Sequence, residues 1–168
     1  WDLSLVDPDN RRPVDYAERR RLLELTERVA AALDEPERRR AALRELTQNW
    51  QDGREKLHVL RSVLAFRRAR PALFQAGSYS ALAASGEHAE HVCAFMRAAD
   101  GVRAAVIVPR LLVKRWSPSG GIDWGDTHLA LPSGRYRCLL SGAVFDARAP
   151  LPLARLLSEL PVALLISL

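Results

Sequence analysis

The sequence predicts an α+β chain in two parts, with helices over residues 1–73 and an antiparallel β sandwich over residues 74–168. Three observations support this division. Apolar residues recur at spacings of three and four as far as Pro71, and this helical period disappears after Phe74. Short apolar runs separated by turn residues then fill the rest of the chain. With 168 residues, 48% of them hydrophobic, the chain is long enough to bury a core.

The first helix is expected to begin at a capping-box-like pair. Asp15 and Glu18 lie three residues apart just after Pro13, so the aspartate can accept a backbone N–H of the first turn. The helical pattern continues to about residue 33. Its repeating apolar residues are Leu22, Leu25, Val29 and Leu33.

Two further helices follow in the first part. Pro36 suits the first turn of the second, Asp52 can cap the third, and Pro71 ends it. Helices with one apolar face need a partner surface. The residues that share a face are Leu43, Leu46 and Trp50 in the second helix, and Leu57, Leu60, Val63, Leu64 and Arg67 in the third.

The second part reads as short strands. Asp100-Gly101 is a strong two-residue hairpin signal between two strand-like runs, because glycine supplies the positive φ that such turns need. Turn clusters separate the later runs, as in an antiparallel sandwich. Expected strands are 91–99, 102–112, 128–131, 135–140 and 161–168, with one or two helical turns within 152–160.

Composition excludes several classes of protein. The net charge is +5, but basic and acidic residues alternate along the chain, which favours a solvated surface over a nucleic-acid stripe. No apolar run is long enough to cross a bilayer, and no signal-peptide pattern is present. Cys93 and Cys138 are interpreted as two buried thiols of a cytosolic protein.

Two clusters look chemically suggestive and have plainer interpretations. Glu87, His88, Glu90, His91 and Cys93 resemble metal ligands in composition, but no second cluster completes a zinc set, so we interpret them as a polar approach to a strand. Trp116 and Trp124 flank a glycine-rich turn. Tryptophans in such a place either stack on sugar rings or, more often, fill a sandwich core.

The opening loop, DPDNRRPVD over residues 7–15, and DGREKL over residues 52–57 carry a more specific signal. Together with LAFRRARPALFQAGSY, AFMRA, VIVPR, WGDTHLALP and ELPVALL in the same order, they resemble the maltooligosyltrehalose synthase family, an α-amylase-like branch of glycoside hydrolase family 13. The resemblance covers essentially the whole chain, but only the C-terminal portion of such an enzyme. It implies that residues 1–73 are the last helical layer of a (β/α)8 barrel and that residues 74–168 are the sandwich domain that follows it.

The resemblance also implies an activity. Such enzymes convert the reducing-end α-1,4 bond of a maltooligosaccharide into an α,α-1,1 bond, in trehalose biosynthesis in the cytoplasm, without a cofactor. The implied partners are the maltooligosaccharide substrate and the remainder of the barrel, with no nucleic acid and no membrane. The catalytic carboxylates would precede Trp1, so no catalytic residue and no metal ligand is expected in this chain, and the chain alone would be inactive.

The candidate substrate-binding residues are Asp9, Asn10, Arg11, Arg12 and Lys56. Loops at the C-terminal end of barrel strands line active sites, and these side chains offer acceptors and fork-shaped donors for sugar hydroxyls. An equally good alternative is that a salt-bridge and turn network only fixes the loop, with Pro8 and Pro13 stiffening it. The residues of that network would be Asp7, Asp9, Arg11 and Arg12.

Two other function classes stay open: a stand-alone carbohydrate-binding module that uses exposed tryptophans, and a basic nucleic-acid-binding protein. An exposed apolar surface on the helices would favour the barrel-fragment interpretation over both.

Overall fold

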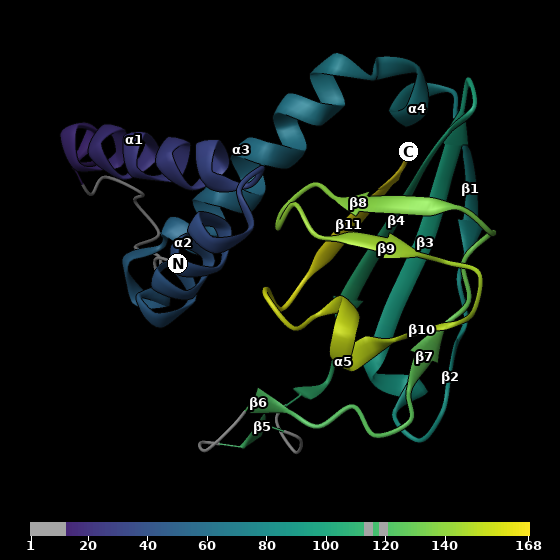
Figure 1. The fold of residues 1–168 in the computed structure, drawn as a ribbon. Coiled ribbons are helices and arrows are strands. Elements are labelled where there is room, and N and C mark those ends of the chain that lie inside the picture. Colours follow the sequence, from purple (N-terminus) through teal and green to yellow (C-terminus); the bar gives the residue numbers. More distant parts are fainter. Residues whose placement is uncertain (1–12, 113–115, 118–120) are drawn as a thin grey trace. The chain divides into compact units, whose positions relative to one another are not determined.

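The computed structural model describes residues 13–112, 116–117 and 121–168 (Figure 1). The chain divides into two compact units, one ending at Leu64 and the other beginning at Ala65. We describe each unit by itself. The α+β class predicted from the sequence is confirmed, since helices form the first unit and an antiparallel sheet dominates the second.

The first unit is helical, with α1 (Tyr16–Ala32), α2 (Pro36–Gln48), a short 3-10 turn η1 (Trp50–Asp52) and the start of α3 (Arg54–Ala69). Asp15 caps α1 as predicted, because its Oδ1 accepts the backbone N–H of Glu18 at 2.8 Å. Pro36 occupies the first turn of α2, also as predicted. The buried residues of this unit are Thr26, Val29, Leu43, Leu46, Arg54 and His58.

Several large apolar side chains of the first unit lie at the surface. Trp50 is 48% exposed, Leu60 is 46% exposed and Leu64 is 56% exposed. Leu60 and Leu64 are one turn apart on α3, so they share a face of that helix. This face of α3 therefore exposes two large apolar side chains.

The second unit begins within α3 and continues through a short helix, α4 (Pro71–Gln75), into the strands. Its main sheet has six strands in the order β1-β3-β4-β11-β8-β9, and a second, smaller sheet has the order β10-β7-β2. A single turn of helix, α5 (Leu153–Leu156), lies where one or two turns are predicted. The strands are β1 (Ser78–Ala81), β2 (Ala84–Ser85), β3 (Val92–Ala99), β4 (Val102–Pro109), β5 (Trp116–Ser117), β6 (Gly121–Ile122), β7 (His128–Leu129), β8 (Arg135–Cys138), β9 (Val144–Asp146), β10 (Leu151–Pro152) and β11 (Ala163–Ser167).

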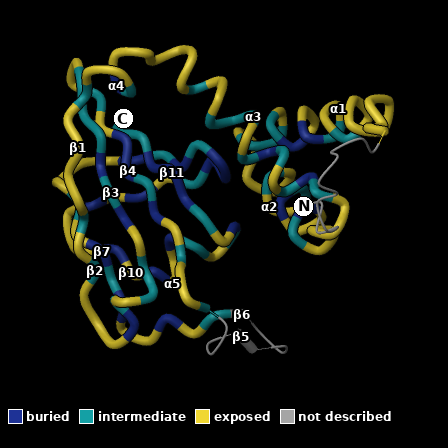
Figure 2. The backbone as a smooth tube through the Cα atoms, turned by 180° about the vertical axis from the view of Figure 1, so that it is seen from behind, coloured by how far each residue is buried: buried dark blue, intermediate teal, exposed yellow. Residues whose placement is uncertain are grey.

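The predicted hairpin is confirmed. β3 and β4 pair over eight residues, and Asp100 and Gly101 connect them with φ values of 50° and 77°. β11 pairs with β4 on one side and with β8 on the other, so the strand that comes last in sequence lies inside the sheet (Figure 1). Consecutive residues are buried on the central strands, such as Ala104 and Ala105 on β4, so buried side chains lie on both faces of the sheet there. The edge strand β1 is exposed throughout (Figure 2). Buried residues of the unit include Ala94, Met96, Ala105, Ile107, Leu129, Tyr136, Cys138, Leu153 and Leu165.

The interpretation of both cysteines as buried is wrong for one of them. Cys138 is buried, but Cys93 is exposed, and both are free thiols. Cys93 alternates along β3 with the buried Ala94, and its cross-strand partner Val108 is exposed as well. Its side chain therefore projects from the outer face of the sheet.

None of the helices in the described ranges is both long and apolar enough to cross a membrane.

Candidate functional site

The predicted substrate-binding residues fall into two groups. Asp9, Asn10, Arg11 and Arg12 lie outside the described residues, and their role stays a prediction. Lys56 lies in the first turn of α3, where it is exposed. Its role in substrate binding also stays a prediction.

The residues around Lys56 form a fixed local network. Asp52 accepts two hydrogen bonds from Arg54, one from the backbone N–H at 2.9 Å and one from Nε at 2.6 Å. Arg54 also donates through Nη1 to Oε1 of Glu45 at 2.9 Å, which links the start of α3 to α2. Gly53 makes the turn between Asp52 and α3 with φ of 79°, a left-handed conformation that glycine adopts without strain. The DGREKL motif thus forms the start of α3, and the hydrogen bonds of Arg54 hold this start in place.

Arg54 is only 9% exposed, which makes it an unusual buried cation. The hydrogen bond to Glu45 is the main reason that the pKa of Arg54 is raised, with Asp52 adding to it. Burial by itself lowers the pKa of Arg54, because it disfavours the charged form, and for the same reason it raises the pKa of the Glu55 carboxyl. Lys56 was predicted from its motif and Arg54 was not, although an aspartate two residues before an arginine at a helix start is a signal for such a pair.

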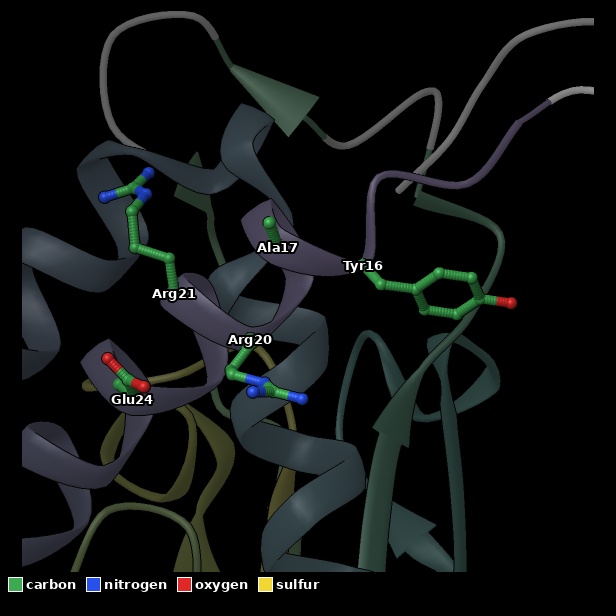
Figure 3. A pocket seen from close by; sticks show the side chains of 5 residues that line it. All are labelled: Tyr16, Ala17, Arg20, Arg21 and Glu24. Atoms are coloured by element: carbon green, nitrogen blue, oxygen red, sulfur yellow. The ribbon is translucent and has the colours of Figure 1, made fainter.

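A hollow of about 400 Å³ lies along the first two turns of α1 (Figure 3). Its lining is amphipathic: an aromatic ring, two guanidinium groups and a carboxylate. Tyr16 is 75% exposed, and Figure 3 shows its ring and the Arg20 guanidinium projecting toward the same side of the helix. The lining residues are Tyr16, Ala17, Arg20, Arg21 and Glu24. None of these five residues was predicted as a site residue from the sequence.

The suspected metal cluster is a loop contact. The backbone N–H of Glu87 donates to Oδ1 of Asp126 at 2.8 Å, and the N–H of the buried His88 donates to Oγ1 of Thr127 at 3.0 Å. Nε2 of His88 lies 3.6 Å from the Glu87 carboxylate. Among the described residues, no three His, Cys, Asp or Glu side chains are placed to hold a metal ion. The loop before β3 is therefore held to the loop before β7 by hydrogen bonds from its backbone to the side chains of Asp126 and Thr127.

Among the described residues, the predicted tryptophan pair offers no exposed ring on which a sugar could stack. Trp124 is only 5% exposed, as the core interpretation predicts. The side chain of Trp116 lies outside the described residues. A binding module that depends on Trp124 is thus not supported.

Two comparisons with known proteins, one of sequence and one of structure, find the same enzyme. No family model matches the chain. Two Mycobacterium tuberculosis proteins (strains CDC 1551 and H37Rv), provisionally named maltooligosyl trehalose synthase, are 38% identical to it over 166 residues. The alignment covers 99% of this chain and 17% of either relative. In solved structures, maltooligosyltrehalose synthase from Arthrobacter ramosus matches with a TM-score of 0.70 and a mutant of it with 0.71. Both are 32% identical to the chain and are matched over all of it and over 19% of their own length.

The chain has the fold of an α+β segment of a much larger carbohydrate enzyme, and it matches that segment over its whole length. More particularly, it corresponds to a C-terminal portion of the maltooligosyltrehalose synthases, and the resemblance found in the sequence is confirmed. The chain spans about a sixth of the length of the curated relatives it matches.

Proposed function

We propose that this chain is the C-terminal portion of a cytoplasmic maltooligosyltrehalose synthase of the α-amylase-like glycoside hydrolase family 13. The complete enzyme isomerises the reducing-end α-1,4 bond of a maltooligosaccharide to an α,α-1,1 bond. Residues 1–73 form the last helical layer of its barrel, and residues 74–168 form the sandwich domain that stabilises the barrel. The observation that carries this proposal is the alignment of 166 of the 168 residues to relatives that bear this enzyme's name.

The surface of the first unit supports the proposal. Trp50, Leu60 and Leu64 each leave roughly half of their side chain in water, and apolar area gains free energy when it is covered. The remainder of the barrel is the partner that covers it. Large contiguous apolar patches mark sites of contact with other protein, and we propose that these side chains belong to one.

The catalytic carboxylates of the complete enzyme are proposed to lie before Trp1. Retaining glycosyl transfer needs two carboxyl groups about 5 Å apart on either side of one bond. In the described helices of the first unit, Glu18 is bound to Arg21 and Glu45 to Arg54. These two carboxylates serve the helices. The isolated chain is expected to be inactive because it would lack the catalytic pair.

The test compares this chain with the full-length product of the same gene on maltopentaose. Reducing ends and free glucose are followed together. Loss of reducing ends with little free glucose, from the full-length product only, is the expected result, because isomerisation consumes a reducing end without releasing a sugar. A rise in reducing ends would show an ordinary hydrolase instead. Activity of the 168-residue chain itself would contradict the proposed position of the carboxylates.

A further inference from the structure

The hollow along α1 contains the chemical groups that recognise a sugar. Tyr16 offers an exposed aromatic face, on which the apolar C–H face of a pyranose ring can stack. Arg20 supplies planar N–H donors, and Glu24 supplies carboxylate acceptors. These three residues follow one another at intervals of four, so they lie along one side of α1 on successive turns.

The polar groups of this hollow are available to a ligand. Within the described part of the chain, neither the Arg20 guanidinium nor the Glu24 carboxylate takes part in a hydrogen bond or an ion pair. Arg21 differs, because Glu18 holds it through two hydrogen bonds of 2.7 Å. The buried residues of α1, Thr26 and Val29, belong to another side of the helix, so core packing does not account for the exposed ring.

The charge pattern selects among ligands. A phosphate would be attracted by the arginines but repelled by Glu24, which lines the same hollow. An uncharged polyol meets both donors and acceptors without an unpaired charge. A volume of about 400 Å³ is within the range of small-molecule sites and can hold a sugar unit.

We infer that Tyr16, with Arg20 and Glu24, binds a glucosyl unit of the maltooligosaccharide, as a subsite of the complete enzyme. This inference rests on the proposed function. If α1 follows the last barrel strand, its first turn lies at the C-terminal face of the barrel, where active sites of this fold are found. The hollow then lies at the same end of the barrel as the active site, and Tyr16 is a binding residue rather than a catalytic one.

The experiment measures kcat and KM of the full-length gene product on maltopentaose for wild type, Tyr16→Ala, Tyr16→Phe and Arg28→Ala. Removing the ring should raise KM about fivefold to tenfold with kcat within about twofold, because stacking contributes equally to the ground state and the transition state. Tyr16→Phe keeps the ring and should stay near the wild-type KM. Arg28 is the matched control, since it is exposed on the same helix but does not line the hollow.

Each outcome decides the inference. A KM for Tyr16→Ala within twofold of wild type, with isomerisation intact, overturns it and leaves the proposed function standing. If Tyr16→Ala does not fold, Arg20→Ala and Glu24→Ala must raise KM, and an unchanged KM in both overturns the inference. If wild type shows no isomerisation, the proposed function fails. Calorimetric titration with maltopentaose then tests sugar binding at Tyr16 separately. Weaker binding by Tyr16→Ala than by wild type supports the subsite. Equal binding, or none by wild type, rejects it.

Discussion

Gly86→Ala should destabilise the sheet unit far more than a glycine substitution usually does. Gly86 has φ of +105°, and a Cβ there would lie 2.7 Å from Oδ1 of Asp126 and 2.7 Å from Cα of Thr127. These are the residues that accept the N–H groups of Glu87 and His88. The added methyl therefore strains the backbone and pushes apart the two loops that these hydrogen bonds join.

The magnitude follows from three contributions. A left-handed backbone costs a non-glycine residue about 1 kcal/mol, and each lost hydrogen bond costs a further ~1 kcal/mol, more for the buried N–H of His88. We expect a loss of about 3 kcal/mol in the free energy of unfolding, and a fall in Tm of about 6–12 °C for a chain of this length.

Gly101→Ala is the matched control. Gly101 also has a positive φ, +77°, but no atom lies within 4 Å of its added Cβ. Only the backbone cost of about 1 kcal/mol should remain. Urea unfolding followed by tryptophan fluorescence, which includes the buried Trp124, measures both variants. Equal losses in the two variants would refute the reasoning, because the loop contact would then contribute nothing.

Two other predictions concern the start of α3. Arg54→Ala should lower the free energy of unfolding by about 2 kcal/mol, because it removes charge-assisted hydrogen bonds from a buried site. Arg40→Ala is the control and should change it by less than about 0.5 kcal/mol, since the pair of Arg40 with Glu37 is exposed. Urea midpoints of both variants measure this, and similar midpoints would contradict it. The second prediction is that Glu55 makes the folding stability depend on pH. Burial raises the pKa of Glu55, so the folded chain holds that proton more tightly than the unfolded chain does. Stability should therefore decrease as the pH rises from the unfolded value, near 4.5, through the raised folded pKa. Glu55→Gln should remove that decrease, and an unchanged slope of unfolding free energy against pH would argue against it.

The helices and the central hairpin were predictable because their signals are local. Asp15 caps α1, Pro36 opens α2 and Asp100-Gly101 turns between β3 and β4, each through the conformational preference of its own residue type. α3 ends at Ala69, just before Pro71, as a proline there requires. Pro71 then opens α4, a five-residue helix too short to show a period.

Of the other strands, β7, β8 and β11 lie within predicted runs, whereas those such as β1 and β9 were not predictable from periodicity. All four residues of β1 are exposed, so this edge strand has no alternation of apolar and polar residues to detect. β9 has three residues, and its single buried side chain is Phe145. Strand order is even harder to predict than strand position, because the pairing of β11 with both β4 and β8 joins segments far apart in sequence.

The candidate site shows the same limit. Motif resemblance directed attention to Lys56 and to the loop of residues 9–12, because those letters recur in a known family. The hollow beside Tyr16 depends on which side of α1 faces the core, and this is known only once α2 packs against α1. An exposed tyrosine and a buried one look alike in a sequence.

The place of β11 has a consequence for synthesis on the ribosome. Chains emerge from their amino end, and here β3 and β4 can form a hairpin early, whereas the strand between β4 and β8 consists of residues 163–167. Until those residues leave the exit tunnel, β4 and β8 each have an open edge, and Ala105 and Ile107 have no β11 neighbours. The sheet unit therefore completes its folding only after residues 163–167 have been translated, and a nascent chain stalled before them would be a substrate for chaperones.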